Sequence, residues 1–276
     1  MTSKYVLAVV LLLLTMLIAL NLYAVSANDL DIANDSGLLW LVNRKDKLPA
    51  SYKPEDLSEY KGIKLHSAAK EPFTQMLKAM QTDGIHGLRL QSAYRTFSYQ
   101  EAVFNQRVKE FTTRGYSKIE AERAASKSVQ PPGASEHQLG LALDVTLDGT
   151  LTQAFGETHA GKWLEEHSHN YGFIIRYPSE KTCITQIVYE PWHLRYVGVP
   201  HSSIMKNLEL TLEEYLSYIK QVQTYIHWEC DSNYYLLSYS NALPTALPPE
   251  TVSISSFNAS KAEYVITMRK TYQNAR

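Results

Sequence analysis

The chain has 276 residues, with 27 lysine and arginine residues against 28 aspartate and glutamate residues, and its formal net charge at pH 7 is −1. This near-neutral balance gives no basic surface for gripping phosphate groups, so nucleic acid is not an expected partner. The length predicts one main globular domain with an appended element. The only cysteines are Cys183 and Cys230; we expect two buried thiols or, in an oxidising compartment, one bridge.

An apolar run near the start predicts a membrane segment. Residues 5–24 carry no charge, are almost all apolar, and match the ~20 residues that span a bilayer. Val25-Ser26-Ala27 has the small side chains of a cleavage site, so residues 1–27 are predicted to be a signal peptide or, slightly preferred, an uncleaved anchor. A buried core helix is the alternative. No second apolar span follows in the sequence, which predicts that the rest of the chain is extracytoplasmic.

The next segments alternate between irregular and periodic patterns. Residues 28–65 show no sustained period and predict an irregular lead-in. Residues 71–81 place apolar side chains on one helical face and predict a helix that stops before Gly84. Residues 88–93 then predict a strand.

Two capping-box patterns mark further helix starts. Ser98 with Glu101 predicts the start of a helix that carries apolar residues as far as Phe111. Ser117 with Glu120 predicts a shorter, charged helix, which ends before the Pro-Pro-Gly sequence at 131–133.

A period of two marks the most informative strand. Apolar residues alternate with small or polar ones over residues 139–145, which predicts a strand with one apolar face. Asp144 lies on the opposite face with Gly140 and Ala142, whose lack of bulk would leave room for an ion and a peptide.

The last third of the chain continues the mixed pattern. A helix and two strands are predicted over residues 161–170, 173–177 and 187–189. Thr211 with Glu214 predicts a capped amphipathic helix. From about Tyr234, tyrosine-rich and β-branched runs broken by prolines predict an appendage of two or three strands.

Four residues in two stretches could carry chemistry. His137, Asp144 and His193 are suitable zinc ligands, and three protein ligands leave the fourth position of a tetrahedral ion open for water. A separate carboxylate must take the proton of that water, and Glu190 is the candidate. The spacing alone leaves another interpretation open, in which His137 is a loop histidine and Asp144 a strand-end aspartate.

The two stretches together resemble the two signatures of the D-alanyl-D-alanine carboxypeptidases of the VanY type. They read Ser135-x-His137-x-x-Gly140-x-Ala142-x-Asp144 and Glu190-Pro191-Trp192-His193-x-Arg195-Tyr196-Val197-Gly198. The resemblance runs from about Tyr94 to Gly198. It also takes in Tyr94-Arg95-Thr96 with Gln100, and Tyr171-Gly172-Phe173 leading to Arg176-Tyr177-Pro178.

The resemblance implies one zinc ion and a role for each matching residue. It makes His137, Asp144 and His193 the ligands and Glu190 the catalytic base. Arg95 matches the family arginine that meets the substrate, and its fork of donors suits a terminal carboxylate. Ser135 and Gln100 are implied to contact substrate. The alternatives are a surface charge at a helix entry for Arg95 and a loop-structuring hydroxyl for Ser135.

These observations predict an α+β fold in which a small antiparallel sheet with flanking helices forms a zinc cleft. The predicted division is a signal peptide or anchor, a lead-in, a catalytic domain and a C-terminal helix with a β appendage, over residues 1–27, 28–65, 66–206 and 207–276.

The resemblance implies removal of the C-terminal D-Ala from peptidoglycan stem peptides by a protein anchored by residues 5–24 or secreted toward the cell wall. No obligate protein partner is implied. Three alternatives remain open: an L,D-carboxypeptidase that trims tetrapeptide stems, a zinc endopeptidase that cuts cross-bridges, and a catalytically silent wall-binding module. The four intact metal-site positions argue against the silent module.

Overall fold

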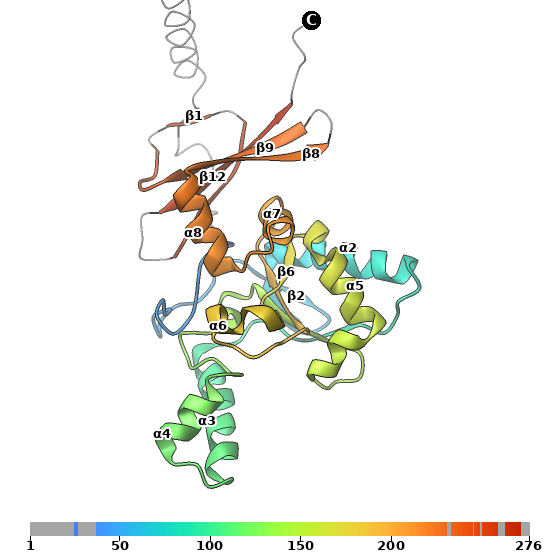
Figure 1. The fold of residues 1–276 in the computed structure, drawn as a ribbon, viewed down its shortest axis with the longest axis vertical. Coiled ribbons are helices and arrows are strands. Elements are labelled where there is room, and N and C mark those ends of the chain that lie inside the picture. Colours follow the sequence, from blue (N-terminus) through green and yellow to red (C-terminus); the bar gives the residue numbers. More distant parts are fainter. Residues whose placement is uncertain are drawn as a thin grey trace, which may run out of the picture.

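The computed structural model describes residues 25–26, 37–230, 233–244, 246–248, 250–258 and 263–271. The apolar segment 5–24 lies outside the described residues. None of the helices in the described part of the chain has the length and apolar character needed to cross a bilayer. The fold is mixed α and β with small antiparallel sheets, as the sequence predicts (Figure 1).

A four-stranded antiparallel sheet in the order β4-β5-β7-β6 forms the centre of the molecule. Its strands are Arg89–Ser92, Ala142–Thr146, His193–Tyr196 and Phe173–Ile175, respectively. On one face, Leu143 and Val145 pack in a core with residues of helices α2 (Ser67–Thr82) and α5 (His159–His167). Because side chains alternate along a strand, Ala142 and Asp144 of β5 point to the opposite face.

The predicted strand over 139–145 is only partly correct. Residues Glu136–Leu139 form the 3₁₀ turn η2, and the strand begins at Ala142. Gly140 separates the two with φ +75°, and a Cβ there would approach the His66 nitrogen to 2.9 Å. Leu139 and Leu141 are apolar because they pack in a separate cluster with Val42 and Leu48. The apolar residues of 139–145 therefore belong to two different cores, one for Leu139 and Leu141 and one for Leu143 and Val145.

Helices α3 (Phe97–Thr112) and α4 (Lys118–Ala125) lie side by side and project from the central sheet (Figure 1). The predicted capping box at Ser98 and Glu101 is wrong. Thr96 caps α3 instead, because its hydroxyl accepts a hydrogen bond from the Tyr99 amide at 3.1 Å. The capping box of Ser117 with Glu120 at the start of α4 is confirmed.

The lead-in is more ordered than its sequence suggests. Residues 57–66 form a hairpin of β2 (Leu57–Tyr60) and β3 (Ile63–His66), with Lys61 and Gly62 at positive φ in the turn. The hairpin strands have four residues each, too short to show a convincing period.

Between the main strands the chain forms several short helical segments. The 3₁₀ turns are η3 (Gln153–Glu157), η4 (Ser168–Tyr171) and η5 (Ser179–Lys181), and the short α-helices are α6 (Thr182–Thr185) and α7 (His201–Asn207). The predicted helix over 161–170 is thus α5 followed by η4. The strand predicted over 187–189 is wrong, since these residues form a loop whose Val188 amide bonds the Lys127 carbonyl.

A second four-stranded antiparallel sheet, in the order β11-β12-β9-β8, follows helix α8 (Leu212–Val222). Its strands, in chain order, are β8 (Thr224–Cys230), β9 (Asn233–Ser240), β11 (Thr251–Ser256) and β12 (Tyr264–Thr271). A two-stranded pair joins β1 (Val25–Ser26) to β10 (Ala246–Leu247). The appendage thus begins about ten residues earlier than predicted and is larger.

Helix α8 lies between this C-terminal sheet and the central part of the molecule (Figure 1). Its capping box of Thr211 with Glu214 is confirmed. The buried face of α8 packs in one cluster with Leu237 and Val265 of the C-terminal sheet and with Ile174 of the central sheet. The two sheets therefore share a core through this helix.

Candidate active site

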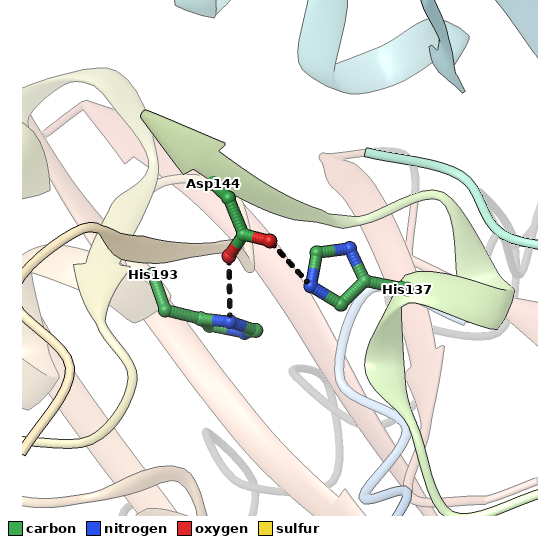
Figure 2. A group of neighbouring side chains, drawn as sticks. All are labelled: His137, Asp144 and His193. Atoms are coloured by element: carbon green, nitrogen blue, oxygen red, sulfur yellow. Dashed lines mark ion pairs between the residues drawn. The ribbon is translucent and has the colours of Figure 1, made fainter. Parts of the chain in front are cut away.

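Three separate elements bring the predicted metal ligands together. His137 comes from η2, Asp144 from β5 and His193 from β7, and Figure 2 shows the carboxylate between the two imidazole rings. Asp144 and His193 are directly paired across the β5–β7 ladder. One ligand atom from each of the three residues lies within 4.8 Å of the others, and all three side chains are buried. This group could hold a metal ion.

The hydrogen bonds of the group fit a cation. His137 Nδ1 lies 2.7 Å from the Ala93 carbonyl oxygen and must donate to it, which leaves Nε2 with a free lone pair. That Nε2 lies 3.2 Å from Asp144 Oδ2. Burial, and then the charge of Arg95, lower the pKa of His137 to about 4, so the ring is neutral at neutral pH. A neutral imidazole lone pair facing a carboxylate oxygen is an arrangement that a cation stabilises.

His193 presents Nδ1 to the same place, 3.1 Å from Asp144 Oδ1. Its ring is packed against the ring of Tyr177, with centroids 4.9 Å apart, and it meets His137 edge to face. Two imidazole nitrogens and a carboxylate form a donor set that suits zinc and leaves a coordination position open.

Glu190 lies beside this group. Its Oε2 is 3.7 Å from His193 Nδ1, and its backbone is fixed by a hydrogen bond from its amide to the Tyr177 carbonyl. Burial, and then the negative charge of Asp144, raise the pKa of Glu190 well above its usual value. A raised pKa makes a carboxylate a stronger base, which suits a group that takes the proton of an attacking water.

Arg95 lies at the site, which excludes the interpretation of a surface charge at the helix entry. Its Nη2 donates to Asp144 Oδ2 at 2.7 Å, and its Nε donates to Ser92 Oγ at 2.9 Å. Nη1 makes a longer contact of 3.4 Å with Gln100 Oε1. Gln100 is buried and donates to the Gln130 carbonyl, which fixes its orientation.

These side chains line one cleft of about 750 Å³. Ser135 is buried at its wall and makes no side-chain cap of η2. One face of α3 forms a second wall, from Gln100 through Val103 to Arg107 and Glu110. The cleft thus continues from the metal-ligand group along α3, with room for more than a single amino acid.

The sequence motifs gave no role to several residues that shape the site. Tyr177 buttresses His193, and Glu136 beside His137 is fully buried between Arg176 and Arg195. A charged residue directly before a ligand was the available signal for Glu136, but its two partners lie about 40 and 60 residues further along the chain.

Two imidazoles, a carboxylate and a neighbouring buried acid in an open cleft define the site of a metal-dependent hydrolase. The family model for VanY, D-alanyl-D-alanine carboxypeptidase, matches residues 62–199, half of the chain. The putative carboxypeptidase YodJ of Bacillus subtilis (strain 168) is 36% identical over 204 residues, covering 69% of this chain and 71% of YodJ.

Solved structures agree with this match. A mutant of the vancomycin-resistance D,D-pentapeptidase VanY from a VanB-type resistance cassette, in complex with Zn(II), is 37% identical with a TM-score of 0.59, covering 64% of this chain and 98% of that one. VanYB in complex with D-alanine-D-alanine gives the same identity and TM-score, with 65% and 97% covered. The LD-carboxypeptidase LdcB is 36% identical with a TM-score of 0.58, covering 67% and 87%.

The chain therefore belongs to the VanY family of D-alanyl-D-alanine carboxypeptidases. The predicted family, the zinc metallopeptidase class and the zinc cofactor are confirmed.

Proposed function

We propose that this chain removes the C-terminal D-Ala from the stem peptides of peptidoglycan, with His137, Asp144 and His193 as zinc ligands and Glu190 as catalytic base. The observation that carries the proposal is the meeting of three buried ligand atoms within 4.8 Å of one another at one end of a long cleft. Family membership supports the reaction class.

Each residue of the group has a separate role in the proposed hydrolysis. Zinc, when bound, lowers the pKa of water and polarises the carbonyl to be attacked. His137 offers Nε2, since its Nδ1 is committed to Ala93, and His193 offers Nδ1. Glu190 accepts the proton of the attacking water and delivers it to the amine of the departing D-Ala. Its raised pKa suits this exchange.

The terminal carboxylate of the substrate needs a fixed cation, and we propose Arg95 for this role with Gln100 and Ser135 beside it. Arg95 is anchored by Asp144 and Ser92, and among the described residues Nη1 makes just the long contact with Gln100. That nitrogen remains the available donor for a carboxylate on the cleft side.

An L,D-carboxypeptidase activity on tetrapeptide stems is the second candidate, favoured by the likeness to LdcB. The two are separated by incubating the protein with pentapeptide and tetrapeptide stems and identifying the released amino acid and the shortened product. Release of D-Ala from the pentapeptide alone supports the proposal; release from the tetrapeptide alone supports the second candidate. A product with a new internal terminus would indicate an endopeptidase, and no product with zinc present would indicate a binding module.

The substrate also sets the expected location. Peptidoglycan stems lie outside the cytoplasmic membrane, and we propose that residues 5–24 either anchor the protein there or are removed on secretion. In this arrangement residues 66–206 form the catalytic domain, behind the lead-in of 28–65, and 207–276 form its C-terminal helix and β appendage.

A further inference from the structure

A buried ion network lies directly behind the metal-ligand group. Glu136 immediately precedes His137, and its Oε1 lies 2.8 Å from Arg176 Nε and 2.9 Å from Arg195 Nη1. All three side chains are almost completely buried. Arg195 is two residues after His193 on β7, so the network spans from one proposed ligand to the other.

Arg176 carries the network to the C-terminal helix. Its Nη1 and Nη2 donate to the two carboxylate oxygens of Glu213 in the first turn of α8, at 2.9 and 2.7 Å. The backbone amide of Arg176 donates to the His193 carbonyl at 3.1 Å. The next residue, Tyr177, packs its ring on His193, and its carbonyl oxygen accepts a hydrogen bond from the Glu190 amide. A displacement of Arg176 would therefore reach both His193 and Glu190.

Arg195 carries the network to the lead-in. Its Nη2 donates to the carbonyl oxygens of Leu38 at 3.0 Å and Trp40 at 3.1 Å. The segment before the family-matched region is thus linked to Glu136 through Arg195, and the helix after that region is linked to Glu136 through Arg176.

Net stability is a poor explanation for this arrangement. Burying two guanidinium groups and a carboxylate costs desolvation energy, and apolar side chains of similar size often serve stability as well or better. What a network of ion pairs provides, with one bidentate pair between Arg176 and Glu213, is orientation. The network ties η2, which carries His137, to β7, which carries His193, and through Arg176 it adjoins Tyr177, whose carbonyl accepts a hydrogen bond from the Glu190 amide.

We propose that Glu136 and Glu213 are positioning residues, through which the lead-in and helix α8 hold the proposed zinc ligands in their binding geometry. The C-terminal region is then a working part of the metal site. This inference rests on the proposed ligand set.

The test compares Glu213→Gln with Lys220→Gln in the full chain. Each substitution removes one charged side chain of α8 that forms an ion pair. Lys220 pairs with Glu263 at an exposed position, outside the network of Glu136. Zinc affinity is measured by competition with a chelator, and the visible spectrum of the cobalt(II)-substituted protein reports ligand geometry. Folding is checked by circular dichroism, and kcat and KM are measured at saturating zinc.

We expect Glu213→Gln to bind zinc about 10- to 100-fold more weakly, with a changed cobalt spectrum and a lower kcat at unchanged KM. Lys220→Gln should match the parent in each measurement. If Glu213→Gln is folded and keeps both the parent zinc affinity and the parent spectrum, Glu213 has no positioning role and the inference fails.

Two further outcomes are informative. If Glu213→Gln does not fold, Glu213→Asp, which keeps the charge on a shorter side chain, is measured by the same comparison and must show the same loss. If the parent itself binds no zinc, or if its zinc affinity is unchanged by His137→Ala, the proposed function fails together with the inference.

Discussion

The two four-stranded antiparallel sheets of this protein differ in what they bury. The central sheet β4-β5-β7-β6 buries ionisable side chains, namely Asp144, His193 and Arg195. Within the described residues of the C-terminal sheet the buried polar side chains are hydroxyls, of Thr251, Ser255, Ser256 and Thr267. The C-terminal sheet instead exposes large apolar side chains, with Ile226 51% and Trp228 54% exposed on its edge strand β8.

This difference indicates that the central sheet carries the catalytic site and that the C-terminal sheet supports it. Burying a charge is costly unless it is paired, so ionisable groups buried at close quarters mark the place where a fold does chemistry. The C-terminal sheet has the longer strands, and in the account proposed above it supports the site through α8 and the carboxylate of Glu213. The predictions below test this division.

The largest expected effect is the loss of zinc and activity in His137→Ala, compared with a control substitution on the C-terminal sheet. His137→Ala removes a proposed ligand, so zinc per chain and D-Ala release should both fall to background. Trp228→Ala, on the C-terminal sheet, should keep parental zinc content and stay within about twofold of parental activity because exposed substitutions away from special features have small effects. Zinc is measured by atomic emission and D-Ala by a coupled oxidase assay. Equal losses in the two variants would contradict the division.

A smaller effect is expected from Arg95→Ala. Hydrogen bonds to a charged group are worth about 1.5–3 kcal/mol, so kcat/KM for a stem peptide with a free carboxyl end should fall by roughly 10- to 150-fold. An amidated end should already be a poor substrate for the parent and should lose little more. The matched control is Arg89→Ala, since Arg89 is an exposed residue of the same sheet that bonds the Leu147 carbonyl.

Arg95 also bonds Asp144, so zinc content must be measured in the same samples. If Arg95→Ala keeps its zinc and loses activity selectively on substrates with a free carboxyl end, the result supports recognition of the terminal carboxylate by Arg95. If the parent turns over free and amidated ends equally, Arg95 does not recognise the terminal carboxylate.

A third effect concerns stability rather than activity, and it has a defined pH range. Burial would raise the pKa of Glu136, but Arg176 and Arg195 lower it from 4.5 to about 2. A carboxylate with a lowered folded-state pKa stabilises the fold above its unfolded pKa, and this contribution is lost as pH falls from about 4.5 towards 2. The shift corresponds to about 3 kcal/mol in all.

Urea unfolding with excess chelator, which removes the contribution of zinc, measures this difference at pH 7 and pH 3. The parent should lose more unfolding free energy than Glu136→Gln over this range, so that the gap between them narrows at pH 3. A gap that is constant across the range would show that Glu136 does not ionise in this way.

The short motifs made the centre of the site predictable from sequence. His137 and Asp144 lie seven residues apart and Glu190 and His193 three apart, so local patterns and the family resemblance could identify them together. The capping boxes at Ser117 and Thr211 were likewise predictable, because a capping box is formed within four residues.

The rest depends on contacts that no local pattern records. Strand β7 has only four residues, too few for its alternation of polar and apolar side chains to predict a strand. Thr96 was missed as the cap of α3 because the Ser98 pattern looked equally good two residues later. The role of Glu136 was not predictable from a local pattern, since Arg176 and Arg195 converge on it, and Glu213 on Arg176, only in the folded chain.

The most direct test of the proposed mechanism separates binding the metal from using it. Glu190→Gln preserves the size and polarity of the side chain but cannot carry the proton, and its zinc per chain and rate of D-Ala release are measured beside those of the parent. The proposed role predicts near-parental zinc with activity reduced by roughly 10²–10⁴-fold, the usual worth of general acid–base catalysis. Loss of zinc from the Gln variant would make Glu190 a ligand or a support, and retention of both zinc and rate would assign the base to another group.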